Sequence, residues 1–445
     1  MAIKPNDQNI GRFLTLFGEF EQSLNGHKES PAHQIRQMAI NRLKSLSFPT
    51  RRDEEYKYTS VTRLVTQDYH LNPPNDLEAA VVDAFRIPDL HAATLVFVNG
   101  QFRKDLSDVD ALPDGLHLET IDDALQDEAH KSHIHDLLTS AVESGQDPFV
   151  VLNAAFAKRG YYLHVPRHTQ VSRPVHFLYV NTEAEQPYLF NPQNMVVVEP
   201  GAELTLVETF NSTAPATAQY FGNLFNRMIV RENAHVHHYK IQRESLEAFQ
   251  MNNTEVYQYQ DSTYSNYTID LGGRIVRNNL NAIHKGQNVT SNMYGSFYGR
   301  KNQHIDNHTF IDHAIPHCQS NELYKGILTD KARGVFNGKV LVRKDAQKTN
   351  AFQQNSSLVL SDRAVMDSKP QLEIFADDVK CSHGATIGQL EEDAVFYLRS
   401  RGLSNERARE ALQYAFLLEV LEFMPNEAMR VYAEAQINDK FTEAI

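Results

Sequence analysis

Four short stretches decide the fold of this chain: ELTLVETF at residues 203–210, EVYQYQ at 255–260, GVFNGKVLV at 334–342 and PQLEIFA at 370–376. Apolar and polar residues alternate in them, which is typical of β-strands that bury one face. Similar segments recur every ~10–20 residues between residues 149 and 388, separated by Gly, Asn and Asp. This region therefore predicts a core built mainly from short strands.

Asparagine is frequent in the same region, with 22 between residues 151 and 360. Asparagine tolerates the left-handed backbone turns that a winding chain needs at its corners. The strand segments are short and do not alternate with helices. About 240 residues of this kind favour a β-solenoid, and a large β-sandwich is the alternative.

The segments before and after this core have a helical pattern. Apolar residues from Ile35 to Leu46 recur at helical spacing, and another helix is predicted within 119–143. Between them, LVFV and QFRKD flank Asn99-Gly100, a strong signal for a β-hairpin. We expect an N-terminal mainly helical domain with a hairpin over residues 1–148, a core over 149–400 and a C-terminal helical domain over 401–445.

The C-terminal segment predicts a helix with two apolar faces. Ser404 is a suitable N-cap, and Glu406 in the first turn favours the helix dipole. One face can pack on the core, and the second indicates a docking surface for a partner, although burial of both faces under the body is equally compatible. The first face contains Ala408, Leu412, Phe416, Val420 and Phe423, and the second contains Leu417, Leu421 and Met424.

Composition narrows the possible functions. The 445 residues carry a net charge of −13, which argues against binding to nucleic acid or to an anionic membrane. No apolar run approaches the ~20 residues of a membrane span, and the first residues lack the pattern of a secretory signal, so we expect a cytoplasmic protein. With only two cysteines, the chain lacks the thiols for a disulfide framework or a four-thiolate zinc or iron–sulfur site.

The segment Lys380-Cys381-Ser382-His383-Gly384 is the first candidate site. On an extended strand Cys381 and His383 point to the same side, with their Cα atoms roughly 7 Å apart. A thiol and an imidazole form a soft ligand pair suited to zinc, iron or an iron–sulfur centre. Two ligands are too few for a closed site, so a partner chain or a carried ligand would have to complete it. The alternative is a buried cysteine beside a hydrogen-bonded histidine.

The second candidate is a dense histidine cluster. On strands, one pair of its histidines shares a face and so does the other pair, which predicts a metal site across neighbouring strands; side-chain ladders and turn hydrogen bonds are the alternative. No enzyme motif accompanies this cluster. For example, Gly334–Lys339 lacks the spacing of a P-loop. The cluster contains His304, His308, His313 and His317, with Asp306, Asp312 and Cys318 beside them.

Several runs of the sequence resemble the SufB/SufD family of iron–sulfur cluster assembly proteins. The similarity covers roughly residues 150–437 and is most specific over 320–402. Within it, KCSHGATIG resembles the SufD branch, since SufB-type chains typically have a glutamate directly after the histidine. The runs are Tyr324–Gly326, Gly334–Lys339, Ala346–Asn355, Lys369–Ile374, Ala376–Gly388 and Phe396–Gly402, with Glu55–Thr59 and residues 152–179 upstream.

The resemblance implies a right-handed parallel β-helix core flanked by N-terminal and C-terminal helical domains. It also implies a heterodimer with a SufB-like protein through the β-helix and docking of a SufC-type ATPase on the C-terminal helices, about residues 404–437. Homodimer formation by the isolated chain is left open.

For the site, the resemblance implies that Cys381 and His383 lie near the interface with the SufB-like partner, which supplies the remaining ligands. His383 is the residue implicated in nascent-cluster assembly. The cargo is then a transient iron–sulfur cluster shared with the partner, with no cofactor tightly bound to this chain alone, and the chain is a non-enzymatic subunit. Two alternatives remain: a stand-alone metal-dependent β-helix enzyme that uses the His304–His317 cluster, and a SufB-like primary scaffold that holds a cluster by itself.

Overall fold

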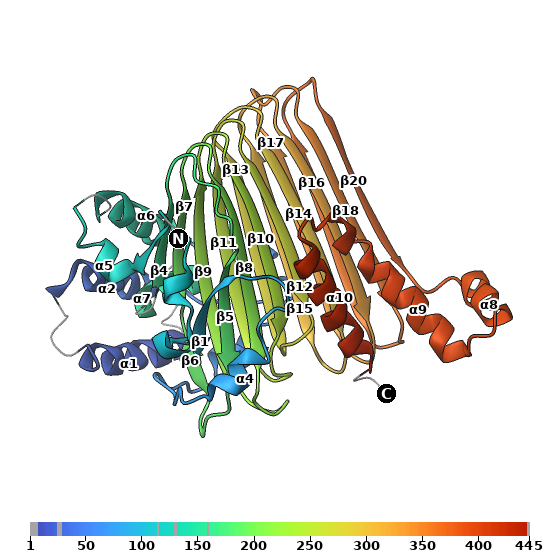
Figure 1. Cartoon of the computed structure of the whole chain (residues 1–445), viewed down its shortest axis with the longest axis horizontal. Helices are drawn as coiled ribbons and strands as arrows, with labels where there is room; N and C mark the ends of the chain where they lie inside the picture. Colours follow the sequence, from blue (N-terminus) through green and yellow to red (C-terminus); the bar gives the residue numbers. More distant parts are fainter. Residues whose placement is uncertain (1–7, 25–28, 114, 129–130, 158–159, 443–445) are drawn as a thin grey trace.

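The computed structural model describes residues 8–24, 29–113, 115–128, 131–157 and 160–442. Within them, two sheets of ten strands each enclose a shared interior (Figure 1). From β7 onward, consecutive strands alternate between the sheets, and each strand is parallel to its neighbours within its sheet. This arrangement is a parallel β-solenoid, so the predicted fold class is confirmed and the β-sandwich is excluded.

Sheet I contains β1 (Ala93–Val98), β2 (Gln101–Phe102), β5 (Val175–Asn181), β8 (Glu203–Ser212), β10 (His235–Arg243), β12 (Thr263–Asp270), β14 (Thr290–Gly299), β16 (Gln319–Leu328), β18 (Asn350–Val359) and β20 (Lys380–Gly388). Sheet II contains β3 (His117–Thr120), β4 (Gly160–Val165), β6 (Tyr188–Phe190), β7 (Gln193–Val198), β9 (Tyr220–Val230), β11 (Phe249–Gln258), β13 (Ile275–His284), β15 (His304–His313), β17 (Arg333–Val342) and β19 (Val365–Ile374).

Asparagine contributes to the solenoid in two ways. Asn233 and Asn288 occupy left-handed corner positions, as predicted, but Asp, Lys and His residues occupy other corners with positive φ. Many of the remaining asparagines lie on strands and form side-chain ladders between turns. In one such ladder, Asn321 Nδ2 donates to Asn292 Oδ1 at 3.1 Å across two adjacent strands. Asparagine therefore stabilises the stacking of the turns as well as their corners.

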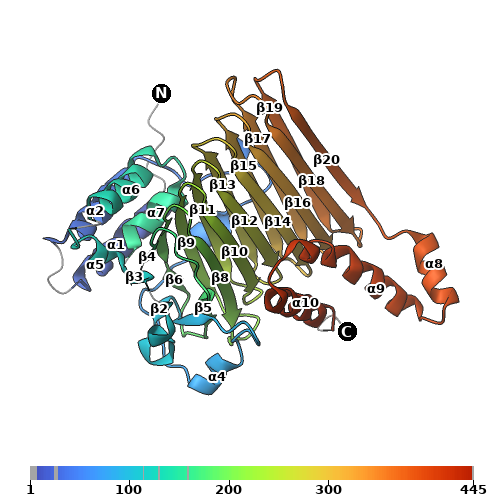
Figure 2. The same cartoon turned by 45° about the horizontal axis from the view of Figure 1, so that its top comes forward.

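The first end of the solenoid is closed. The predicted hairpin is confirmed, because β1 and β2 pair antiparallel around Asn99 and Gly100, which both have positive φ. In sheet II, β3 pairs antiparallel with β4. Helices from the N-terminal region pack on the outer face of sheet II, where Phe149 contacts the ring of Phe221 (Figure 2). The helices of this region are α1 (Gln8–Gln22), α2 (Pro31–Leu43), α3 (Thr62–Val65), α4 (Ala79–Asp83), α5 (Ile121–Ala124), α6 (Lys131–Ser144) and α7 (Pro148–Phe156).

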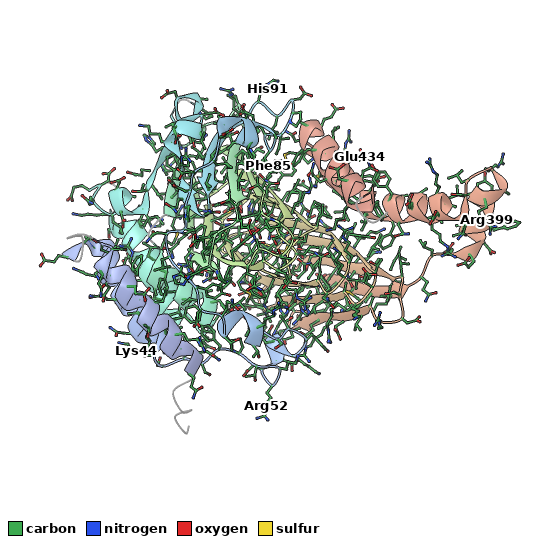
Figure 3. The ribbon with its side chains drawn as sticks, turned by 90° about the horizontal axis from the view of Figure 1, so that it is seen from below. Lys44, Arg52, Phe85, His91, Arg399 and Glu434 are labelled. Atoms are coloured by element: carbon green, nitrogen blue, oxygen red, sulfur yellow. The ribbon has the colours of Figure 1, made fainter. Side chains whose placement is uncertain are left out.

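Residues 53–59 form a strap that crosses the outer face of sheet II from β13 to β19. The Tyr56 ring lies 4.0 Å from the Arg277 guanidinium on β13, Thr59 donates to Asp306 on β15, and Glu54 pairs with Lys369 on β19. Figure 3 shows Arg52, just before the strap, on the side of the solenoid opposite Glu434 of the C-terminal helices. The strap thus ties the N-terminal region to strands near the other end.

The C-terminal helices are α8 (Glu392–Ser400), α9 (Asn405–Leu418) and α10 (Glu427–Thr442). Ser404 is the N-cap of α9, as predicted, and its hydroxyl accepts from the Arg407 backbone N–H at 3.2 Å. The end of α9 and α10 cover the outer face of sheet I, whereas α8 projects beyond the last strands (Figure 1). The face predicted to include Leu417, Leu421 and Met424 is buried against that sheet, so it is already occupied by the body of the protein.

The ends of the helical regions can now be placed. Helix α7 begins at Pro148 and packs with the N-terminal helices, while the last strand ends at Gly388, before α8. Residues 1–7 and 443–445, which the predicted terminal domains include, lie outside the described residues. None of the helices in the described segments has the length and apolarity needed to cross a bilayer.

Close packing in the interior makes one glycine a sensitive position. A Cβ atom at Gly326 would lie 2.0 Å from Cζ of Phe297, whose side chain is fully buried, whereas a Cβ at Gly384 on β20 would meet no atom within 4 Å. We expect Gly326→Ala to reduce the free energy of unfolding by about 1–3 kcal/mol. The matched variant Gly384→Ala should change it little. Urea unfolding followed by circular dichroism measures both, and equal stabilities would contradict this packing.

Candidate functional site at the open end of the solenoid

The second end of the solenoid is open. In the described part of the chain, β19 and β20 each have a strand on one side only, so their other edges have no strand partner. A long unpaired edge is a template for pairing with another chain. Exposed large apolar side chains are concentrated here, which marks an interaction surface rather than ordinary solvent-exposed protein. They are Phe352, Val365, Ile374, Phe375 and Ile387.

Cys381 and His383 lie on the last strand of sheet I, facing the interior. Strand β20 pairs in register with β18, placing Cys381 beside Ala351 and His383 beside Gln353. Ala351 and Gln353 are buried between the sheets, and register partners in a parallel sheet point to the same side. The two predicted site residues therefore share one face, as their i and i+2 spacing indicated.

The two side chains have different surroundings. Cys381 packs against a small apolar cluster that includes Val340, Val342 and Ala376, and burial raises the pKa of its thiol above the ordinary value. His383 is exposed at the open end. Cys381 therefore lies half-buried in an apolar setting, whereas the His383 imidazole is exposed to a ligand that approaches the open end.

Behind His383 lie two polar residues that sequence reasoning missed. Gln353 on β18 and Glu322 on β16 occupy the same inward-facing column, and Gln353 Nε2 donates to Glu322 Oε1 at 3.1 Å. Burial raises the pKa of Glu322 to about 7, although hydrogen bonds from Thr309 and Gln353 partly oppose this shift. To detect this column from sequence, one would have to align the strands of successive turns, because its residues lie about 30 positions apart.

Two of the clustered histidines lie on the outer face of sheet II, beneath the strap. His304 Nε2 lies 2.7 Å from Thr59 Oγ1, and His308 Nε2 lies 3.0 Å from Asp306 Oδ1. Burial lowers the pKa of His304 to about 4. Burial alone would raise the pKa of Asp306, but His308 and Arg277 hold it well below its ordinary value. These side chains form a closed hydrogen-bonded network that fixes the strap to the sheet.

The other two histidines point elsewhere. His313 faces the interior, where its Nε2 lies 2.9 Å from Ser320 Oγ and burial lowers its pKa to about 4. His317 is exposed at a corner with φ of 64°, and the neighbouring Cys318 is fully buried. Over the residues that the structure describes, no three His, Cys, Asp or Glu side chains are grouped to hold a metal ion. The structure does not bring the four histidines together as one group.

These features define a class: a parallel β-solenoid closed at one end, with a cysteine and a histidine on one face of an unpaired edge strand at the other. Comparison with known proteins identifies the family. Residues 179–416 match the SufBD core domain of SUF system FeS cluster assembly, and residues 7–177 match the N-terminal region of SufBD proteins. The chain belongs to the SufBD family.

Individual relatives agree with this assignment. The chain is 34% identical over 412 residues to an iron–sulfur cluster assembly SufBD family protein of Synechocystis, covering 91% of this chain and 90% of that protein. It is 29% identical over 443 residues to the iron–sulfur cluster assembly protein SufD of Escherichia coli, covering 99% of both. The SufD protein of Bacillus subtilis is 29% identical over 307 residues, 66% of this chain and 67% of that protein.

The surroundings of Cys381 predict low thiol reactivity. We expect its alkylation by iodoacetamide, followed by peptide mass spectrometry across a pH series, to show an apparent pKa above the ordinary value near 9. In urea the same peptide should return to the ordinary value. Cys318 is an internal comparison, because burial raises its pKa to about 11. A lower apparent pKa for Cys381 in the folded chain than in urea would contradict an apolar setting.

Proposed function

We propose that this chain is a non-enzymatic SufD-type subunit of a SUF complex that assembles iron–sulfur clusters. The observation that carries the proposal is His383, an exposed inward-facing imidazole on the unpaired edge strand of the solenoid. A SufB-like partner would pair with this end and cover its exposed apolar residues. The family and its SufD relatives support this role.

The cluster is the cargo of the complex rather than a resident cofactor of this chain. His383 would contribute one nitrogen ligand, and the partner would supply the others, because among the described residues no three His, Cys, Asp or Glu side chains are grouped to hold a metal. Cys381, which is half-buried among apolar side chains, would have a secondary role at most. The shared site would form only where the two open ends meet, so it would be protected from solvent during assembly.

A SufC-type ATPase would dock on the C-terminal helices, within the region 404–437 predicted from sequence and on α8 before it. Leu417 and Leu421 are buried under the body, so they are not available to a partner. Phe396 and Tyr397 of α8 are 70% and 56% exposed, and Figure 3 shows Arg399 of the same helix far from the solenoid. Closure of two ATPase subunits would pull on these projecting helices and open the interface to iron and sulfide.

Removal of the His383 imidazole tests the cluster role. We expect His383→Ala to abolish cluster absorbance when the complex with SufB-like and SufC-like partners, isolated through this chain, is reconstituted with iron and sulfide. The complex should remain intact, since substitution of an exposed side chain changes stability by only about 0.5 kcal/mol. Cys381→Ser serves as the comparison and should retain most of the absorbance.

Three results would contradict parts of this proposal. Unchanged absorbance in His383→Ala would remove His383 from the site. A cluster on the isolated chain would favour a SufB-like primary scaffold. Tight metal binding by the isolated chain that is lost on substitution of His304 or His308 would favour a stand-alone metal-dependent enzyme.

If the ATPase subunit docks on α8, a charge introduced at an exposed apolar position of α8 should weaken its binding. We expect Phe396→Asp to weaken binding of the ATPase subunit by roughly 30-fold, equivalent to about 2 kcal/mol for loss of one apolar anchor. Met38→Asp is the matched control, because Met38 is 38% exposed on α2, in the N-terminal region and outside the proposed dock. Isothermal titration with the purified ATPase measures both. Equal binding by wild type and Phe396→Asp, or equal weakening by both variants, would contradict docking on α8.

A further inference from the structure

The inner column of sheet I leads directly to His383. Glu322 on β16 pairs with Gln353 on β18, which pairs with His383 on β20, so the three residues occupy equivalent positions on successive turns. Adjacent strands lie about 4.8 Å apart, within reach of a hydrogen bond between such side chains. Glu322 and Gln353 are 3% and 2% exposed, whereas His383 is exposed. The column therefore runs from the interior to the candidate site.

Hydrogen bonds fix the direction of the Gln353 amide. Thr309 Oγ1, from the opposite sheet, donates to Glu322 Oε2, and Gln353 Nε2 donates to Glu322 Oε1. When it is ionised, the Glu322 carboxylate can only accept, so it holds the NH₂ group of Gln353 toward itself. The amide oxygen must then point away from Glu322. Gln353 Oε1 is buried and has no hydrogen-bond partner among the described residues.

This unpaired oxygen needs an explanation, because a buried acceptor without a donor costs about 1–3 kcal/mol. The neighbouring inward position on the same strand shows the usual solution. Asn355 donates through Nδ2 to the Tyr324 carbonyl and accepts through Oδ1 from Ser368 Oγ, so both ends of its amide have a partner. Gln353 differs in that the next residue of its column is an imidazole at the open end.

We propose that Gln353 is a positioning residue that accepts the N–H of His383 through Oε1 and so fixes which ring nitrogen faces the cluster site. Glu322 acts one turn further inside by setting the direction of the amide. The inference rests on the proposed role of His383 as a ligand. Metal-binding histidines are commonly oriented in this way by a hydrogen bond to their second nitrogen, and loss of such a partner costs roughly 10–100-fold in metal affinity or activity.

Two variants separate orientation from folding. Gln353→Met keeps the side-chain length and removes the acceptor, while Glu322→Gln keeps the shape and lets the Gln353 amide turn its NH₂ group toward His383. Ser357→Ala is the matched control, because Ser357 is also buried on the inner face of β18 but pairs in register with Ile387. Each variant is compared with the wild type by urea unfolding.

The first readout is the tautomer of His383 in the full chain. We would measure it at pH 8 by NMR of ¹⁵N-labelled imidazole, with His383→Ala to assign the signal. We expect a single dominant tautomer in the wild type and in Ser357→Ala, and a mixture or the opposite tautomer in Gln353→Met and Glu322→Gln. An unchanged tautomer in both of those variants, with the chain folded, would overturn the proposal.

The second readout is cluster formation in the reconstituted complex, where Gln353→Met should reduce the yield roughly 10–100-fold. The two readouts fail independently. If His383→Ala keeps its cluster, the proposed function is wrong, while the tautomer still tests the hydrogen bond. If His383→Ala loses its cluster but Gln353→Met keeps full yield, His383 is a ligand and Gln353 does not position it.

Discussion

In-register stacking of parallel strands is the constraint on which the rest of this structure depends. In each sheet, a strand pairs in register with the strand one turn before it, so their side chains form columns that run from turn to turn. A residue on one turn is therefore in contact with the residue at the equivalent position on the next turn. Where polar groups follow one another in a column, they can bond from turn to turn. The asparagine ladder of Asn292 and Asn321 and the column of Glu322 and Gln353 are examples on the outer and inner faces.

The first and last strands of a stacked sheet each have one edge whose backbone N–H and C=O groups lack a strand partner. The two ends of the solenoid deal with these edges differently. At the first end, antiparallel strands β2 and β3 complete the sheets, and the N-terminal helices cover the outer face of sheet II. At the other end, neither a strand nor a helix of the described chain covers the edges of β19 and β20. The exposed Phe375 and Ile387 show that this end is apolar as well as unpaired. An unpaired strand edge with exposed apolar side chains is typical of a surface that binds another chain, and the candidate site lies on it.

Much of the fold was predictable from sequence because local patterns determine it. Alternation in segments such as 203–210 predicts strands, Asn99-Gly100 predicts the hairpin and Ser404 predicts the start of α9, and all three are confirmed. The regular repeat was hidden, because strands of sheet I from β8 to β20 begin 27 to 32 residues apart and the corners vary in length. The strand pattern alone favoured a β-solenoid over a β-sandwich. The parallel β-helix was implied by the family resemblance.

The site was only partly predictable, for a related reason. The i and i+2 spacing of Cys381 and His383 places them on one face of any strand. It does not show which of the two side chains is exposed to a ligand. That difference comes from tertiary contacts: Val340 and Ala376, from other turns and corners, surround the thiol.

Likewise, no local pattern links Gln353 to Glu322, since the two residues meet only when the turns are stacked in register. The histidine cluster shows the converse case, in which residues close in sequence separate onto different surfaces. His308 lies beneath the strap and His313 lies in the interior, because strand alternation sends even and odd positions to opposite faces. In a solenoid, chemistry is therefore assembled along columns across turns, and proximity along the chain is a weaker guide to a site than position one turn away.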